Sequence, residues 1–321
     1  MLNGIGGERA GRDCYVTASR AASGSGGGCE VGGGRWHHAT MPPTDPRQHD
    51  PLDDFSTDMF THDGVTRTVY RLGKGPGILF MHEVPGITPT GASFARRLAA
   101  AGFSVAMPDL IGEAGRPLSA GYAAKSLGKM CISREFQAFA LRADRPIIGW
   151  LRALGRDLHQ WAGGPGIGAV GMCLTGGFAL ALAVDDHVLA PVLSQPSLPV
   201  PISPAHARDI GIPDDQAAIV ADRCAAEDLQ IIGLRFHGDP LVPASRFAAL
   251  SERFGDAFTA VTLDDKAWKR ARKAMPEAQR PLSLTGTPHG VLGGDYLDGP
   301  PTEEALARVL ALFTDRLLVS D

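Results

Sequence analysis

The chain has 321 residues, of which 44% are hydrophobic and 21% are charged, a length and composition that suit one large α/β domain with a substantial core. Its net charge of −4 lacks the basic excess that neutralises phosphates, so we expect no nucleic-acid partner. No apolar run reaches the ~18 residues that cross a bilayer, and the N-terminus lacks the pattern of a secretory signal, so we expect a cytoplasmic protein with no membrane partner.

The N-terminal segment differs in composition from the rest of the chain. Residues 1–40 are rich in Gly, Ser and Arg, with too few spaced apolar residues to bury a face, so we expect them to be disordered. Met41 opens a Pro-rich stretch and is a candidate for the natural start. We therefore divide the chain into a disordered extension over residues 1–50 and one α/β domain over residues 51–321.

From Thr66 onward, short β-branched or apolar runs alternate with longer helical patterns. Strands are predicted over residues 66–71, 77–81, 103–107, 167–171, 188–193, 229–236 and 257–263. Helices are predicted over residues 89–101, 134–161, 175–184, 213–226, 243–254 and 302–318. Residues 264–288 interrupt this alternation with a basic, amphipathic stretch, which predicts an insertion over one edge of the domain. The alternation favours an α/β fold with a mostly parallel central sheet and helices on both faces.

Cys173 lies at a predicted strand-to-helix turn, flanked by Gly171 and the pair Gly176–Gly177. A nucleophile at such a turn projects from the sheet edge near a helix N-terminus, which favours the thiolate. An isolated cysteine is more often a small core residue, but this context favours a functional role. Thr175 departs from the pattern, which prefers glycine two places after the nucleophile. The five cysteines form no CxxC pair, so each is expected to be a free thiol.

Two further residues complete a candidate triad with Cys173. Asp239 follows the strand over residues 229–236, where an acid can orient an imidazole, although Gly-Asp-Pro is also ordinary turn chemistry. His289 lies in a Pro-His-Gly loop before the last helix. The order nucleophile, acid, histidine is that of α/β-hydrolases, so we predict a triad of Cys173, Asp239 and His289.

The loop after the strand over residues 77–81 supplies one oxyanion donor in this fold. We therefore predict that the backbone N–H groups of Val84 and Leu174 form the oxyanion hole. Glu83, which precedes Val84, is by itself equally consistent with a solvated loop carboxylate.

Metal and nucleotide sites are not indicated. His82 and the pair His37–His38 lack a third ligand at sensible spacing, and the chain has no HExxH helix. Gly73, Gly75 and Gly77 precede a strand instead of following one. We expect neither a metal nor a cofactor.

Together these residues resemble the dienelactone hydrolase family over about residues 65–318. The resemblance is carried by Glu83-Val84-Pro85-Gly86-Ile87, Ala106-Met107-Pro108-Asp109-Leu110, Gly171-Met172-Cys173-Leu174, Gly238-Asp239 with Val242-Pro243, and His289-Gly290.

The resemblance implies that Cys173 attacks an ester carbonyl to give an acyl-enzyme, with His289 transferring protons and Asp239 orienting it. It also implies that Glu83 holds the thiol's proton until substrate arrives, and that Arg134 binds a substrate carboxylate. A second arginine, expected just after the histidine, is replaced by Val291 and the residues that follow it. Dienelactone itself therefore need not be the substrate.

The leading hypothesis is a hydrolase that cleaves a small-molecule ester or lactone through a cysteinyl acyl-enzyme. Two alternatives stay open: an acyltransferase that uses the same nucleophile, and a catalytically silent α/β-hydrolase fold that binds a ligand or senses thiol chemistry. The sequence leaves the oligomeric state and the physiological substrate open.

Overall fold

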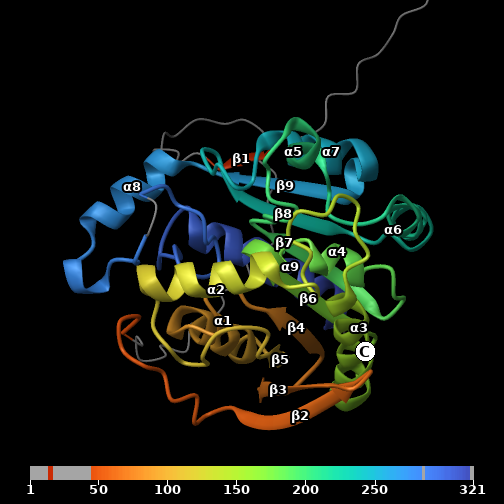
Figure 1. Cartoon of the computed structure of the whole chain (residues 1–321), viewed down its shortest axis with the longest axis horizontal. Helices are drawn as coiled ribbons and strands as arrows, with labels where there is room; N and C mark the ends of the chain where they lie inside the picture. The colour runs from red at the N-terminus through yellow and green to blue at the C-terminus, as the bar shows by residue number, and fades with distance from the viewer. Residues whose placement is uncertain (1–13, 17–44, 284–285, 319–321) are drawn as a thin grey trace, which may run out of the picture.

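The computed structural model describes residues 14–16, 45–283 and 286–318. Within this part of the chain, nine strands form one sheet in the order β1-β9-β8-β7-β6-β4-β5-β3-β2 (Figure 1). The strands are β1 (Cys14–Val16), β2 (Ser56–His62), β3 (Val65–Leu72), β4 (Gly77–Met81), β5 (Ser104–Pro108), β6 (Ile167–Met172), β7 (Val188–Ser194), β8 (Ile231–Phe236) and β9 (Phe258–Leu263).

The pairing is parallel throughout the centre of the sheet. Only β3 runs antiparallel to its neighbours, β2 and β5, at one edge. All the predicted strands are present, within two residues of their expected starts, and β2 is an addition that the sequence did not indicate. The prediction of a mostly parallel central sheet is confirmed.

Helices α1 to α7 lie between the strands in chain order, and α8 and α9 follow the last strand. They are α1 (Pro89–Ala100), α2 (Ala120–Ile132), α3 (Pro146–Ala162), α4 (Phe178–Leu182), α5 (Pro204–Arg208), α6 (Asp214–Glu227), α7 (Ala244–Phe254), α8 (Asp265–Ala274) and α9 (Thr302–Leu317). Short 3₁₀ turns occupy Cys173–Thr175 (η1), Gly255–Ala257 (η2) and Glu277–Gln279 (η3).

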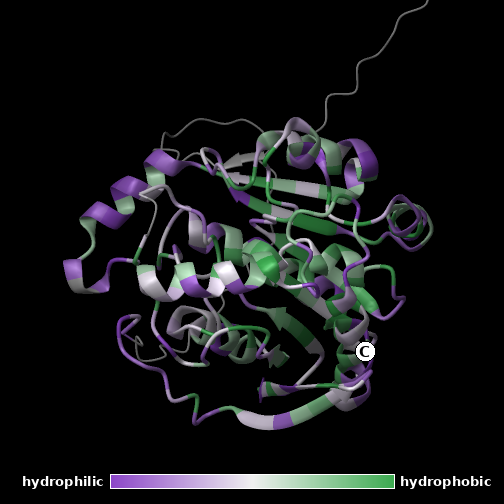
Figure 2. Ribbon diagram, viewed as in Figure 1, coloured by the Kyte–Doolittle hydropathy of each residue, from purple (hydrophilic) through white to green (hydrophobic). Residues whose placement is uncertain are grey.

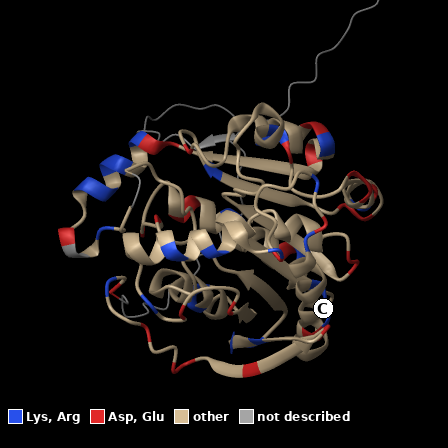
Figure 3. Cartoon of the chain, viewed as in Figure 1, with Lys and Arg blue, Asp and Glu red and all other residues tan. Residues whose placement is uncertain are grey.

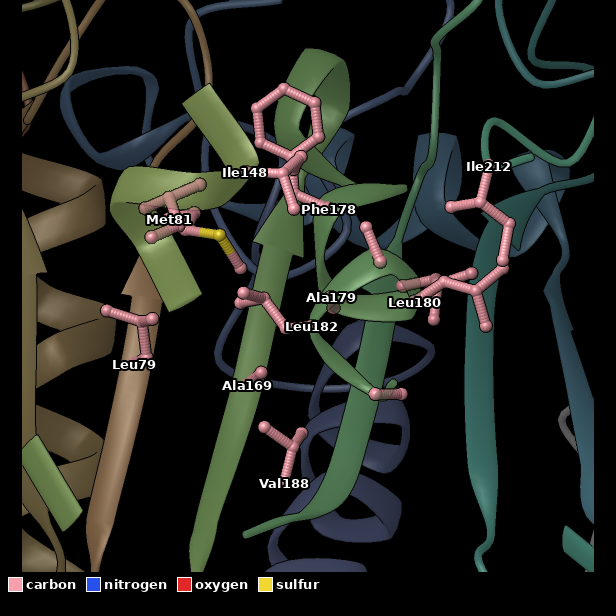
Figure 4. Close-up of a cluster of buried hydrophobic side chains, with 14 of the residues drawn as sticks. Leu79, Met81, Ile148, Ala169, Phe178, Ala179, Leu180, Leu182, Val188 and Ile212 are labelled. Carbon is pink, nitrogen blue, oxygen red and sulfur yellow. The ribbon is translucent and has the colours of Figure 1, made fainter. Parts of the chain in front are cut away.

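Strand β4 shows why helices are needed on both faces of the sheet. Leu79 and Met81 pack into one apolar cluster with residues of α3, α4, α6 and α7 (Figure 4). Ile78 and Phe80, which alternate with them, pack into a second cluster with residues of α1 and α9. Strands buried on both faces read as continuous apolar runs, which Figure 2 shows in the central strands. This doubly covered, mostly parallel sheet is the α/β-hydrolase architecture.

The single helix predicted over residues 134–161 is wrong in its first part. Helix α3 begins at Pro146, and residues 134–145 form turns. The residue before a proline avoids helical backbone, and here the buried Arg145 donates hydrogen bonds to the carbonyls of Phe136 and Ala140, which fixes the turns. The sequence analysis also missed α2, which Ser119 caps by accepting a 3.4 Å hydrogen bond from the N–H of Tyr122.

Parts of the expected N-terminal extension belong to the domain. Strand β1 pairs in parallel with β9 at the sheet edge, contrary to the disorder expected over residues 1–40. An edge strand offers unpaired backbone groups to any short segment, so this pairing needs no apolar side-chain pattern. Asp50 is buried and bonds to Arg96 of α1 at 2.5 and 2.9 Å, so the boundary at residue 50 is also wrong. The rest of the extension, residues 1–13 and 17–44, lies outside the described residues.

The basic stretch over residues 264–288 contains α8, which packs on the domain edge through its buried Trp268. The indole Nε1 of Trp268 donates a 2.7 Å hydrogen bond to the carbonyl of Asp295, a few residues beyond His289. Within the described ranges, no helix is both long and apolar enough to span a membrane.

Candidate active site

Cys173 occupies the sharp turn at the end of β6. Its backbone φ of 56° is in the left-handed region, which a cysteine adopts only where the surroundings enforce it. A Cβ on Gly176 would lie 2.5 Å from the Cα of Pro196, so glycine permits the close approach of the turn to the segment after β7. The helix predicted over residues 175–184 is split into η1 and the short α4.

Thr175 explains the departure from glycine after the nucleophile. Its hydroxyl accepts a 2.9 Å hydrogen bond from the N–H of Met172 and lies 2.9 Å from the carbonyl oxygen of Met81. One threonine side chain therefore ties the Cys173 turn to the end of β4. Because Glu83 follows β4 directly, this contact also fixes the distance between the thiol turn and the Glu83 loop.

The three residues of the predicted triad line one cavity. Oδ2 of the buried Asp239 lies 2.6 Å from Nδ1 of His289, and Oδ1 of Asp239 accepts a 2.9 Å hydrogen bond from the N–H of Leu241. The opposite ring nitrogen, Nε2, is buried and has no hydrogen-bond partner within the usual limits among the described residues. Asp239 thus leaves Nε2 of His289 available on the side of the ring away from the carboxylate.

The surroundings of His289 favour its charged form. Burial opposes the charge, but the negative charge of the neighbouring Cys173 and the hydrogen bond to Asp239 outweigh it, so the pKa of His289 is raised well above its usual value. A histidine in this environment can hold a proton taken from a thiol.

Asp295 holds the His289 loop in place, and the sequence analysis missed it. Its Oδ2 accepts hydrogen bonds from the N–H of His289 at 2.7 Å and of Gly290 at 3.0 Å. Its Oδ1 is buried and has no partner among the described residues, and burial raises the pKa of this carboxyl. The only signal in the sequence is an acid six residues after a loop histidine, which is too common to single out.

Glu83 points at the same loop. Its Oε1 accepts a 2.6 Å hydrogen bond from the N–H of Gly294, and its Oε2 accepts a 3.1 Å hydrogen bond from Nε2 of Gln195. A Cβ on Gly293 would lie 2.3 Å from Oε1 of Glu83, so the glycines that stand where an arginine was expected make room for this carboxylate. Burial raises the pKa of Glu83. Within the described residues, no hydrogen bond joins Glu83 to Cys173.

Gln195 is a second residue that the sequence analysis missed. It is fully buried just after β7, with a backbone φ of 35°. Its Oε1 accepts hydrogen bonds from the hydroxyl of Ser194 and, at 3.3 Å, from the N–H of Val291. Since its Nε2 binds Glu83, Gln195 links the carboxylate to the histidine loop. The sequence did contain one signal for Gln195, since it is a polar residue at the carboxyl end of a predicted parallel strand.

The two predicted oxyanion donors lie on the cavity wall. Val84 and Leu174 both line the cavity that contains Cys173. Among the described residues, no backbone or side-chain oxygen accepts a hydrogen bond from either N–H group. Both donors are therefore available to a bound oxygen.

His82 has a structural role in the loop. Its Nε2 accepts a 3.2 Å hydrogen bond from the N–H of Leu110, so its Nδ1 is the protonated nitrogen and donates to the carbonyl of Glu83 at 2.9 Å. Burial lowers the pKa of His82 to about 4. No group of three side chains suited to a metal occurs in the part of the chain that the structure describes.

The cavity of about 520 Å³ is largely apolar. Helix α2 turns one face toward it, at the i, i+3, i+4, i+7 and i+11 spacing of a helical stripe, with the residues Ala120, Ala123, Ala124, Leu127 and Cys131. Tyr122, Ser126 and Met130 point from the opposite face into the protein. No lysine or arginine is among the described residues that line the cavity.

Arg134 does not contribute to this cavity. It is exposed on the turn after α2, and the cavity wall there is formed by Cys131 and Phe139 instead. The structure therefore does not bring Arg134 to the site, because the turn that carries it buries Phe136 and Ala138 and leaves Arg134 exposed.

The mostly parallel sheet with helices on both faces is the α/β-hydrolase fold. Residues 64–213 match the family model described as the dienelactone hydrolase family, so the resemblance to that family is confirmed, and with it the class of ester and lactone hydrolases. No curated protein matches the chain.

Solved structures agree on the fold. One is a dienelactone hydrolase-like promiscuous phosphotriesterase from metagenomic libraries, with a TM-score of 0.53 and 18% identity over 82% of this chain and 98% of that chain. Another is a putative dienelactone hydrolase from Klebsiella pneumoniae subsp. pneumoniae, with a TM-score of 0.52 and 16% identity over 81% of this chain and 98% of that chain.

Proposed function

We propose that this protein hydrolyses a carboxylic ester or lactone through a covalent thioester on Cys173. The observation that carries the proposal is the 2.6 Å contact between Asp239 and His289 in a cavity that Cys173 also lines. Such a pair fixes the imidazole with its free nitrogen ready for proton transfer.

In the first half of the reaction, the sulfur of Cys173 attacks the ester carbonyl while its proton passes to Nε2 of His289. The N–H groups of Val84 and Leu174 donate to the carbonyl oxygen as it becomes negative. The tetrahedral intermediate then collapses, the C–O bond breaks, and the alkoxide takes the proton from His289 and leaves as the alcohol.

In the second half, His289 takes a proton from water as the water attacks the thioester. The new tetrahedral intermediate expels Cys173 as the thiolate, and the carboxylic acid leaves. Asp239 keeps the ring oriented through Nδ1 and stabilises its charged form in both halves.

We assign Glu83 to control of the thiol's proton. Its raised pKa makes it a better proton acceptor than an ordinary carboxylate. Its two oxygens accept hydrogen bonds from the N–H groups of Gly294 and Gln195. We therefore propose that Glu83 takes the thiol's proton only when substrate displaces one of these hydrogen bonds, and that it returns the proton to Nε2 of His289 before the alkoxide leaves.

The cavity supports a neutral, apolar acyl group. Its wall combines the apolar stripe of α2 with the exposed side chains of Phe139 and Leu241, and it contains three carboxyl groups, those of Glu83, Asp239 and Asp295. An acyl group that carries a carboxylate would meet like charge there, while His289, the one cationic group among the described lining residues, is already bound by Asp239.

Hydrolysis of p-nitrophenyl butyrate tests the proposal. We expect turnover by the native chain, loss of at least 10³-fold in Cys173→Ala, and little change in Cys224→Ala, because Cys224 lies outside the cavity. Intact-protein and peptide mass spectrometry after a quench should find the butyryl group on Cys173. Full activity of Cys173→Ala, or an acyl group on Cys131, would contradict the assignment.

A further inference from the structure

A second cavity of about 320 Å³ adjoins the first, between α8 and the segment that leads to His289. Its described lining contains four cations and no acid: Lys269, Arg272, Lys273 and Arg280, beside Trp268, Ser283 and Gly286. Figure 3 shows the blue of Lys and Arg concentrated along α8. Because the whole chain carries a net charge of −4, this positive charge is a local feature.

The two arginines are held in place by neutral groups. Nε and Nη2 of Arg272 donate to the carbonyl of Pro281 at 3.2 and 3.0 Å, and the guanidinium lies 5.7 Å from the centroid of the Trp268 ring. Nε of Arg280 donates to the carbonyl of Met275 at 3.1 Å, and its Nη2 to that of Lys273 at 3.1 Å. These contacts fix both side chains without neutralising their charge, and each arginine keeps N–H donors for another acceptor.

The four cations also form no close ion pair among the described residues, although Arg272 interacts electrostatically with Asp295. Among the described residues, no carboxylate lies within ion-pair distance of any of them. By contrast, the buried Arg96 binds both Asp50 and Asp54. Clustered, positioned and unpaired cations around a cavity are the chemistry that binds a phosphate or another compact anion.

The second cavity is fixed relative to the candidate active site. Ser283 lines both cavities, and its hydroxyl is buried with no partner among the described residues. Trp268, on the wall of the second cavity, donates to the carbonyl of Asp295, whose carboxylate holds the N–H of His289. The two cavities are therefore neighbours that meet at Ser283.

We propose that the basic cavity on α8 binds the phosphate of a substrate whose ester group lies at Cys173. This inference depends on the proposed function. Since the acyl cavity is apolar and acidic, the phosphate belongs to the alcohol part of the ester. The substrate class is thus an ester between a neutral acyl group and a phosphate-bearing alcohol, in which water cleaves the acyl C–O bond and the phosphate is unchanged.

Direct binding tests the cavity without any catalysis. Isothermal titration calorimetry with pyrophosphate compares the native chain with the double variant Lys269→Gln, Lys273→Gln, whose exposed side chains can be changed without disturbing the Trp268 contact. We expect the double variant to bind at least tenfold more weakly. Arg270→Gln, on the same helix but outside the cavity, is the matched control and should stay within twofold. Equal weakening in both, or binding to vesicles of anionic lipid but not to pyrophosphate, would overturn the proposal in favour of a diffuse basic surface.

Kinetics test the link to the ester. Two butyrate esters are compared, one of a neutral alcohol and one of the same alcohol carrying a terminal phosphate. In the double variant, the ratio of kcat/KM for the phosphate ester over the neutral ester should fall at least tenfold, and it should fall with rising salt in the native chain. An unchanged ratio with intact pyrophosphate binding would overturn the substrate assignment. Pyrophosphate binding without hydrolysis of either ester would support the anion site and reject the proposed function instead.

Discussion

The carboxylate of Asp295 accepts a 2.7 Å hydrogen bond from the backbone N–H of His289, while the imidazole of His289 is bound by Asp239 at 2.6 Å. Two buried acids therefore act on one histidine, one on its backbone and one on its ring. Asp239 comes from the end of β8, whereas Asp295 belongs to the histidine's own loop. The loop position and the ring orientation are thus set separately, and each can be tested without the other.

We predict that Asp295 is a positioning residue. Asp295→Ala removes the acceptor for two backbone N–H groups, so kcat should fall tenfold or more with little change in KM, and the His289 and Gly290 amides should lose protection from hydrogen exchange. Asp295→Asn retains an acceptor oxygen and should recover most of the lost activity. Asp298→Ala, an exposed acid in the same segment, is the control. Normal amide protection in Asp295→Ala would show that the loop is held by other contacts.

The strand positions were predictable because each central strand is an apolar run with a clear start and end. The meeting of Cys173, Asp239 and His289 at one cavity was predictable because these residues stand at strand ends or in the loop before the last helix. Gln195 and Asp295 were not, since their roles arise from contacts between segments: Gln195 lies 112 residues from the Glu83 that it binds. Helix α2 was missed because its apolar stripe is made largely of alanines, which give a weak periodic signal.

Arg134 illustrates the limit of periodicity. The apolar spacing over residues 134–161 continues a helical pattern, but Pro146 begins α3 and the buried Arg145 organises the preceding turns by hydrogen bonds to carbonyls. Arg134, assigned to the pocket from the family resemblance and its distance from Cys173 in the chain, lies exposed on one of these turns.

The second prediction concerns the charge of His289. Burial lowers its pKa, and the neighbouring Cys173 is the largest influence that raises it. In Cys173→Ala that influence is removed, so the pKa of His289 should fall toward or below its usual value of 6.5. Titration of the imidazole resonances by NMR, assigned with a His289→Gln variant, measures the change. An unshifted resonance would mean that Asp239 alone sets the charge of His289.

The third prediction concerns Glu83 and pH. Because its folded-state pKa is raised above 4.5, its contribution to stability is fully present below pH 4.5 and is lost as pH rises through the folded-state pKa. The glutamine in Glu83→Gln cannot ionise. The melting temperature of this variant, relative to that of the native chain, should therefore rise as the pH increases from 4 to 7.5. Its turnover should fall by about 10²-fold, the usual contribution of one general base.

The exposed Glu304 of α9 provides the control, and Glu304→Gln should follow the pH dependence of the native chain. A constant difference in melting temperature between Glu83→Gln and the native chain across this range would show that the folded protein does not resist ionisation of Glu83. Wild-type turnover in Glu83→Gln would separately reject its role in proton control.

The last prediction tests the apolar acyl cavity. Leu127 of α2 lines the cavity and is 43% exposed, so an arginine at this position can keep its charge in water while it narrows and polarises the apolar wall. Leu127→Arg should lower kcat/KM for a hexanoate ester about tenfold, the effect of losing roughly 1.4 kcal/mol of apolar contact. It should raise kcat/KM for an ester whose acyl group ends in a carboxylate, because the wall of the cavity on α2 then carries a guanidinium. Leu141→Arg is the matched control, since Leu141 is also 43% exposed but does not line the cavity. If both variants leave the ratio of kcat/KM between the two esters unchanged, the acyl group does not lie against α2.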